Sequence, residues 1–444
     1  MEETIENEWT REKKNDRKKM TKSHYIKYSF LKGIRLLSPW SLESLKSLLS
    51  CLLIFITVNA TAQQYPFINY DQSKLYLAKD SSQFMKFYKK IDELREGKRK
   101  KVTVVHFGGS HIQAGFWTEV LMDGFQGIGN FKGGGTFIFP FKIVKTNSPH
   151  FFKSFTTGKW IRKRNALSKE MCDNLGMAGM AGITNDSANT FGFNLLRNNH
   201  HQSFNSLRVY HNFNPSFEFS IANQTGLHFV RKDIPKLGYT EFTFETFIDS
   251  VNFNLLKKDS IIPNFMIRGF SIDNTNPGFY YAAIGVNGAS TSSYLRCQEF
   301  VNELSTIPPD LVIFSLGVND THSVNFSKDQ FIANYDSLIA LVKIASPNCT
   351  FLFTTVTDNY MTKRTANKRP IKAEEAMFEL MEKHKAAVYD LYAVMGGYKS
   401  IYKWQKAGLA AKDKVHFNGR GYNLLATMMF DAINRSYKFN SKIK

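Results

Sequence analysis

The feature that most restricts the fold is an alternation of apolar and amphipathic segments along residues 276–444. A continuous apolar run, "PDLVIFSLGVND", is followed by a segment with apolar residues at helical spacing, "SKDQFIANYDSLIALVKIAS". The same order recurs at "CTFLFTTV" and "EEAMFELMEKHKA". Alternating strands and helices of this kind are typical of a parallel sheet with helices on both faces. We therefore expect a three-layer α/β/α domain with a parallel sheet.

A segment with the same order lies far upstream. "KVTVVHFGGSHIQAGFW", Lys101 to Trp117, is a β-branched apolar run that ends on Gly-Gly-Ser and continues with a helical pattern. It predicts a further strand of the same sheet. Residues 63–149 and 276–444 are then the two parts of one α/β domain.

Between these parts, residues 150–275 have a different texture. Short alternating runs such as "SLRVYHN", "FEFSIAN" and "YTEFTFETF" are separated by turn residues. Strands at such regular spacing, without a strong helical pattern, are typical of a β-sandwich. We expect an inserted β-rich domain that interrupts the α/β domain.

Residues 1–62 are expected to direct export. A basic stretch precedes the apolar run "SLLSCLLIFITV", which is too short to span a bilayer, and Ala60-Thr61-Ala62 resembles a cleavage site. The alternative is an N-terminal anchor that stays uncut, which would be the protein's only membrane association. Either way the protein is expected in the periplasm or at the cell surface.

Charge and cysteine content limit the kinds of partner and cofactor that we expect the chain to bind. The chain holds 58 Lys and Arg against 38 Asp and Glu, a net charge of +20. A basic exported protein associates with anionic partners such as polysaccharides, and nucleic acid is not expected there. A basic surface without a dedicated partner is the alternative. Cys172, Cys297 and Cys349 have no metal-ligand spacing, so we expect neither metal nor cofactor.

The residues that carry chemistry lie where predicted strands end, the place for functional loops in an open parallel sheet. Ser110 follows the first strand, and Asp413 and His416 stand in "DKVHF" before the last helix. A serine hydroxyl needs a base to become a nucleophile, and His416 is the candidate. Asp413 is the candidate to orient the imidazole. A phosphate-binding loop is excluded, because G-x-x-x-x-G-K-[ST] is missing.

A tetrahedral oxyanion also needs preorganised donors. The candidates are the backbone N–H groups of Ser110 and Gly288 and the side-chain amide of Asn319. Each motif is weak by itself, because Gly-Gly-Ser is common in turns. Their ordered joint occurrence favours an acyl-transfer enzyme.

These blocks resemble those of the SGNH hydrolases, the GDSL esterase superfamily, which has a flavodoxin-like fold. The family order is G-D-S, a glycine, G-x-N-D and D-x-x-H. The matching segments here are Gly108-Gly109-Ser110, Gly288, Gly317-Val318-Asn319-Asp320 and Asp413-Lys414-Val415-His416. "GSHIQAG", "GVNGAS" and "GLAAKDKVHF" are most similar to envelope proteins related to bacterial peptidoglycan O-acetylesterases, which carry a β-rich module between the first two blocks.

The resemblance implies an exported serine esterase that hydrolyses O-acetyl esters on a polysaccharide, with peptidoglycan favoured, through a Ser110–His416–Asp413 triad. The inserted β-rich domain is then expected to help hold the glycan. One departure is Gly109, which replaces the block-one aspartate that helps to shape the nucleophile loop. A non-catalytic glycan-binding protein of the same fold and an O-acetyltransferase remain open.

Three further residues are candidates for substrate binding. His111 and Gln113 follow the nucleophile and could line the pocket, with helix packing as the alternative. Trp404 could stack on a sugar ring, with core packing as the alternative.

Overall fold

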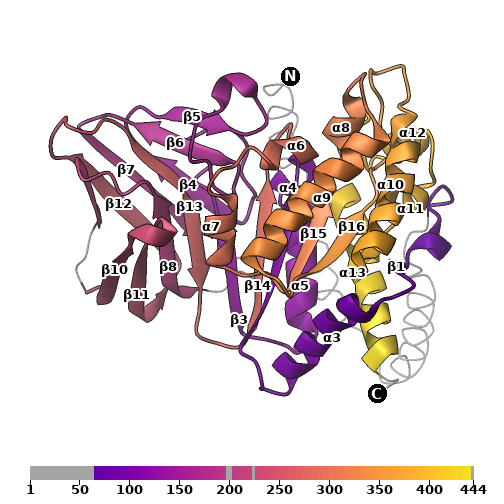
Figure 1. Cartoon of the computed structure of the whole chain (residues 1–444), viewed down its shortest axis with the longest axis horizontal. Coiled ribbons are helices and arrows are strands. Elements are labelled where there is room, and N and C mark those ends of the chain that lie inside the picture. Colours follow the sequence, from indigo (N-terminus) through magenta and orange to yellow (C-terminus); the bar gives the residue numbers. More distant parts are fainter. Residues whose placement is uncertain (1–64, 197–202, 223–225, 442–444) are drawn as a thin grey trace, which may run out of the picture. The chain divides into compact units, whose positions relative to one another are not determined.

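A run of six parallel strands forms the centre of the α/β portion (Figure 1). In spatial order these strands are β17 (Ala387–Tyr389), β16 (Thr350–Thr354), β15 (Leu311–Ser315), β2 (Lys101–Gly108), β14 (Gly278–Gly285) and β3 (Gly133–Ile138). Strands β15 and β16 are almost wholly buried, as their continuous apolar sequences predict. The expected parallel sheet is confirmed. Its two ends are antiparallel, because β1 (Leu75–Leu77) pairs with β17 and β13 (Phe265–Asp273) pairs with β3.

Helices cover both faces of this sheet (Figure 1). One layer holds α3 (Ser82–Arg95), α5 (Phe116–Gly127) and α13 (Gly419–Ser441), which meet through aromatic pairs such as Phe87–Phe125 and Tyr88–Tyr437. The other layer holds α7 (Phe300–Ser305), α9 (Lys328–Ala345) and α10 (Arg369–His384). Short helices occupy the loops: α4 (Ser110–Gln113), α6 (Thr291–Tyr294), α8 (Val318–His322), α11 (Leu391–Met395) and α12 (Ser400–Lys406).

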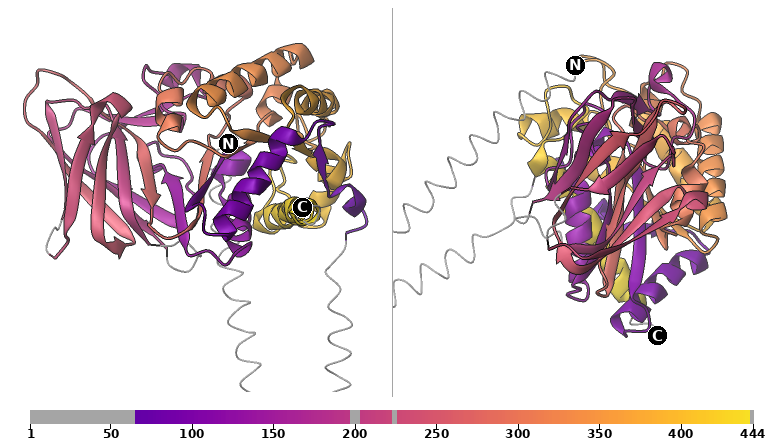
Figure 2. Two further views of the ribbon diagram at one scale, coloured as in Figure 1. Left: turned by 60° about the horizontal axis from the view of Figure 1, so that its bottom comes forward. Right: turned by 90° about the vertical axis from the view of Figure 1, so that its left-hand side faces the viewer.

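The β-rich segment forms a sandwich at the β3 side of the sheet (Figures 1 and 2). One of its sheets continues the α/β sheet through β13 and contains β5 (Ile161–Arg164), β6 (Met180–Thr184), β8 (Phe204–His211), β10 (Phe229–Ile234) and β11 (Tyr239–Ile248). The other contains β4 (Phe152–Thr156), β7 (Ala188–Leu195), β9 (Phe217–Ile221) and β12 (Ser250–Lys257). Buried phenylalanines fill the space between them, for example Phe193 and Phe270 with ring centres 5.1 Å apart.

This computed structural model describes residues 65–196, 203–222 and 226–441. The predicted export segment, residues 1–62, lies outside them. In the part of the chain that is described, no helix has the length and apolar character needed to cross a membrane. Phe67–Lys444 form one compact unit, and the sandwich shares a sheet with the α/β portion, so the domain divisions at 150 and 275 stay predictions.

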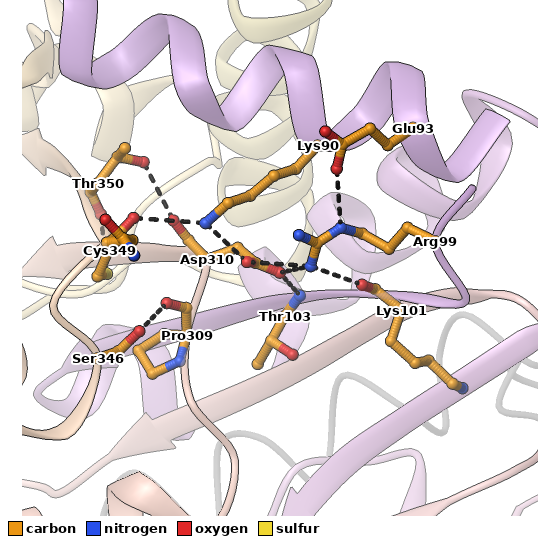
Figure 3. A network of polar contacts seen from close by, with 11 residues as sticks. Lys90, Glu93, Arg99, Lys101, Thr103, Pro309, Asp310, Ser346, Cys349 and Thr350 are labelled. Atoms are coloured by element: carbon orange, nitrogen blue, oxygen red, sulfur yellow. Dashed lines mark hydrogen bonds and ion pairs between the residues drawn. The ribbon is translucent and has the colours of Figure 1, made fainter. Parts of the chain in front are cut away.

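Polar residues tie α3 to the amino ends of the strands, at the edge of the sheet where β2 and β15 begin (Figure 3). The Asp310 carboxylate accepts hydrogen bonds from the Thr103 N–H at 2.8 Å and from Arg99 Nη1 at 3.4 Å. It also pairs with Lys90 Nζ at 2.8 Å. The helix and two strands are therefore fixed at the edge opposite the carboxyl ends.

A buried ion pair joins the sandwich to the α/β portion. Arg268 Nε of β13 lies 2.5 Å from Glu303 Oε1 of α7, and both side chains are almost inaccessible to solvent. The second carboxylate oxygen accepts the Met177 N–H at 2.9 Å. Burial raises the pKa of Glu303, whereas Arg268 opposes that rise. Loss of one partner would leave a buried charge uncompensated.

We predict that Glu303→Gln lowers the free energy of unfolding by about 3–5 kcal/mol, because Arg268 stays buried without a counter-charge. Urea denaturation, monitored by fluorescence, measures the free energy of unfolding of each variant. The control is Glu379→Gln, which removes an exposed partner of Lys328 and should cost less than about 1 kcal/mol. Equal losses in the two variants would contradict a special role for the buried pair.

Candidate active site

The loops that follow parallel strands meet at one edge of the sheet, and three of them, together with the loop between α12 and α13, bring the predicted site residues together. Ser110 is the first residue of α4, directly after β2. Gly288 lies in the loop after β14, and Asn319 lies in α8 after β15. Asp413 and His416 lie in the loop that precedes α13.

Ser110, His416 and Asp413 form a continuous chain of hydrogen bonds. Ser110 Oγ lies 2.8 Å from His416 Nε2, and His416 Nδ1 lies 2.7 Å from Asp413 Oδ2. The other oxygen of Asp413 accepts the backbone N–H groups of Val415 at 2.9 Å and His416 at 3.0 Å. The carboxylate therefore fixes both the loop and the ring. Lys414, which follows Asp413 in this loop, has a φ of +59°. This left-handed backbone conformation makes the turn tight.

The surroundings keep the carboxylate ionised. Burial raises the pKa of Asp413, but the hydrogen bonds and charge of His416 and the backbone N–H groups outweigh it and lower the pKa to about 2. His111 stacks on His416, with ring centres 5.3 Å apart. Burial lowers the pKa of His111 to about 3, so its ring is neutral near pH 7 and adds no positive charge beside His416.

Three donors are available near Ser110. Among the described residues, the Ser110 and Gly288 N–H groups donate to no other group. The Asn319 amide donates one hydrogen to the Ala289 carbonyl at 2.9 Å, which leaves the second hydrogen for another acceptor. Gly288 has a φ of +83°, which favours glycine.

Gly109 brings block one close to Asn319. A methyl group at Gly109 would lie 3.3 Å from Asn319 Nδ2 and 3.5 Å from the Ala289 carbonyl oxygen. Any side chain here would therefore crowd the amide. The backbone φ is −99°, so the glycine is not required by a left-handed conformation.

Asp320, next to Asn319, anchors its loop. Its carboxylate accepts a hydrogen bond from Thr291 Oγ1 at 2.6 Å and one from the Thr291 N–H at 3.2 Å. Burial raises the pKa of Asp320, while these hydrogen bonds oppose the rise. The contact links α8 to α6, so the loops that carry Asn319 and Gly288 are held together.

Gln113 has a different position from the one predicted. It is buried, its Nε2 donates to the Asn147 carbonyl at 2.7 Å, and its Oε1 accepts the Asn287 N–H at 2.7 Å. Both ends of the amide are thus used inside the protein. The prediction that Gln113 contacts substrate is wrong in this structure; the side chain supports the loop that carries Gly288.

His111 and Trp404 are also buried. The His111 ring lies beside His416, and its Nδ1 is 3.1 Å from the Tyr422 hydroxyl. Trp404 is fully inaccessible, donates its indole N–H to the Met395 carbonyl at 3.0 Å and packs edge-on against Phe417. Its predicted stacking on a sugar is therefore wrong, and the alternative of core packing holds.

The sequence reasoning missed Asn287, Thr291 and Tyr422, which hold the site residues from behind. Asn287 had a signal, because it directly precedes Gly288 in "GVNGAS". Tyr422 had none, since a tyrosine in an amphipathic helix usually packs in the core. No cluster of three or more His, Cys, Asp or Glu able to hold a metal occurs among the described residues.

Comparison with known proteins gives one family match over part of the chain. Residues 266–424 match the model of the GDSL-like Lipase/Acylhydrolase family, a span that includes Gly288, Asn319, Asp413 and His416 but begins after Ser110. This part of the chain is similar to GDSL-like lipases and acylhydrolases, and together with the SGNH fold the match supports an esterase. Among curated proteins no similar sequence was found.

One solved structure agrees in fold over most of the chain, and others match a smaller part of it. A peptidoglycan O-acetylesterase structure covers 82% of this chain and 99% of its own, with 16% identity and a TM-score of 0.64. A GDSL-like lipase from Bacteroides thetaiotaomicron has 22% identity over 35% of this chain and 76% of its own, with a TM-score of 0.28. A lipase/acylhydrolase from Enterococcus faecalis has 21% identity over 36% and 77%, with a TM-score of 0.30.

We predict that Gln113→Leu lowers kcat on p-nitrophenyl acetate by about 10- to 100-fold with little change in KM, because the loop carrying the Gly288 N–H loses its anchor. Steady-state kinetics measures both constants. Gln330→Leu, on the exposed side of α9, is the matched control and should leave both constants unchanged. A higher KM at unchanged kcat would instead indicate that Gln113 contacts the substrate.

Proposed function

We propose that this protein is an exported serine esterase that removes O-acetyl groups from a polysaccharide, with peptidoglycan as the favoured substrate. The observation that carries the proposal is the Ser110–His416–Asp413 chain of hydrogen bonds, and the adjoining loops carry the unused donors of Ser110, Gly288 and Asn319. Nucleophile, base, orienting acid and oxyanion donors are the full set of groups that acyl transfer needs.

In the first half of the reaction, His416 Nε2 takes the proton from Ser110 Oγ while the oxygen attacks the acetyl carbonyl carbon. The carbonyl oxygen becomes an oxyanion and accepts hydrogen bonds from the Ser110 and Gly288 N–H groups and the Asn319 amide. The intermediate collapses, the C–O bond to the sugar breaks, and the sugar oxygen takes the proton from His416.

In the second half, water attacks the acetyl-serine. His416 accepts a proton from the water and returns it to Ser110 Oγ as the intermediate collapses to acetate and free Ser110. Transfer to a sugar hydroxyl in place of water would make the same site an O-acetyltransferase. Asp413 stays ionised throughout and stabilises the protonated ring between the two proton transfers.

Gly109 bears on the alternative of a binding-only protein. The missing block-one carboxylate is no part of the proposed triad, and Asp320 and Gln113 hold the neighbouring loops by other contacts. The intact triad geometry favours a hydrolase over a degenerate relative.

Substrate and location rest on three observations. The solved structure with a TM-score of 0.64 is that of a peptidoglycan O-acetylesterase. Peptidoglycan is a polymer of the cell envelope. The net charge of +20 suits an anionic polymer, and residues 1–62 have the features of an export segment. We therefore assign the protein to the periplasm or cell surface.

We predict that Ser110→Ala abolishes hydrolysis of p-nitrophenyl acetate and covalent labelling by a fluorophosphonate, because the nucleophilic oxygen is gone. Release of nitrophenolate and mass spectrometry of the labelled protein measure the two effects. Ser337→Ala, at an exposed position of α9, is the control and should keep both. Activity near the wild-type level in Ser110→Ala would remove Ser110 as nucleophile.

We predict that Asp413→Asn lowers kcat/KM by about 10²- to 10⁴-fold, because a neutral amide no longer stabilises the positive ring that forms when His416 takes the serine proton. Asp413 itself should cause no loss of activity over the usual assay range, since its pKa of about 2 keeps the carboxylate ionised there. Steady-state kinetics of both proteins at several pH values tests this. A rate of Asp413→Asn close to that of the wild type would contradict the pairing.

A further inference from the structure

The loop that carries Asp413 and His416 also carries a cation held between two aromatic rings. Lys414 Nζ lies 4.5 Å from the centre of the Tyr360 ring and 5.2 Å from that of Tyr402. The Tyr360 N–H donates to the Lys414 carbonyl at 3.0 Å, so the segment after β16 is joined to this loop. An aromatic and cationic surface therefore begins two residues from the candidate base.

The same pairing continues away from the loop. Lys406 Nζ lies 5.4 Å from the centre of the Tyr402 ring, and Lys399 and Lys368 lie 5.3 Å and 5.9 Å from that of Tyr398. Tyr398 and Tyr402 are 38% and 42% exposed. The tyrosine–lysine surface consists of Tyr360, Tyr398, Tyr402, Lys368, Lys399, Lys406 and Lys414.

This surface lacks carboxylates of its own. Residues 359–373 contain five Lys or Arg, residues 391–412 contain four, and neither segment has an Asp or Glu. Within the described chain, none of the four lysines of the surface forms an ion pair with a carboxylate, whereas Lys328 and Lys383 on nearby helices do. Lys414 Nζ donates a hydrogen bond to the Lys363 carbonyl, which does not neutralise its charge. The positive charge of all four lysines can therefore attract an external anion.

The backbone beneath the surface is fixed. The buried Asp358 carboxylate accepts the N–H groups of Lys399 at 3.1 Å and Ile401 at 2.9 Å. It thus ties the segment that carries Tyr398 and Tyr402 to the segment that carries Tyr360. A surface ordered before binding loses less conformational entropy when a ligand arrives.

We infer that the tyrosine–lysine surface binds a carboxylate-bearing glycan chain and guides it across the Ser110 site. The ammonium groups match carboxylates, and the exposed tyrosines offer ring faces and hydroxyls to sugar rings. That the bound chain carries the scissile ester rests on the proposed function; the binding itself does not. A glycan is favoured over nucleic acid because the surface leads directly into an esterase site.

The inference places polymer binding on the side of Ser110 away from the sandwich. Tyr360 follows β16, and Tyr398 and Tyr402 lie around α12, near the β17 end of the sheet, whereas the sandwich joins at β3 (Figure 1). The expectation that the inserted sandwich holds the glycan is thus the competing hypothesis, and the two sites predict opposite results for charge changes.

The test uses the full chain in a Ser110→Ala background, so that binding is measured without turnover. The probes are soluble peptidoglycan strands and the same strands with their carboxylates converted to amides. We expect Lys368→Glu/Lys406→Glu to weaken calorimetric binding of the unmodified strands by roughly tenfold at low salt. Binding should weaken as salt rises, and amidated strands should bind weakly to every variant.

The matched control is Lys232→Glu/Lys258→Glu, which makes the same charge change at exposed positions of the sandwich and should leave binding unchanged. Lys368→Gln/Lys406→Gln should give a smaller loss of the same kind, which separates a charge effect from misfolding. A loss confined to the sandwich variant, equal binding of amidated strands, or preference of the surface for duplex DNA over the strands would each overturn the inference.

The proposed function is tested separately with Ser110 intact. Charge-dependent binding at the surface without ester hydrolysis would remove the proposed function and keep the inference. Hydrolysis of acetylated strands at an unchanged rate by Lys368→Glu/Lys406→Glu would keep the function and overturn the inference.

Discussion

The site depends on the register of three parallel strands. Gly108, the last residue of β2, pairs with Gly285 at the end of β14 and with Ser315 at the end of β15. The three strands therefore stop at the same level, and the loops that carry Ser110, Gly288 and Asn319 start side by side. Glycine at two of these ends also lets the backbone of α4 come close. A methyl group at Gly108 would lie 2.1 Å from Ile112 Cγ1, and one at Gly285 would lie 2.3 Å from the Gln113 nitrogen.

Around this register, buried polar contacts fix each loop to its neighbour. Gln113 connects α4 to the Gly288 loop through Asn287, and Asp320 connects α8 to α6 through Thr291. These contacts lie behind the reacting atoms, where low solvent access strengthens them. They also explain how a chain with Gly109 in block one keeps an ordered site: the loops are positioned from their far sides, and a side chain at 109 would press on the Asn319 amide.

Sequence reasoning reached the parallel sheet, the sandwich and the proximity of Ser110, Asp413 and His416, because strand ends and motif spacing are local properties. It did not reach the antiparallel edge strand β1, whose three residues are too few to show a periodicity. It placed Gln113 at the substrate because Gln113 closely follows Ser110, and Trp404 because an indole ring can stack on a sugar. Their burial is set by residues far away in sequence, such as Phe67 against Trp404 and Asn287 against Gln113, and no local pattern reports that.

The distribution of charge separates two uses of lysine and arginine in this protein. Some cations stabilise the fold by pairing with a carboxylate. Lys90 and Arg99 pair with Asp310, and Arg268 pairs with Glu303. Around the Asp413–His416 loop the lysines of the tyrosine–lysine surface pair with no carboxylate in the described chain, and they lie on tyrosine rings instead. A tyrosine ring attracts the ammonium group without neutralising its charge. The field of these lysines therefore extends into solvent beside Ser110, where it raises the local concentration of an anionic polymer without adding a positive contact to the triad itself.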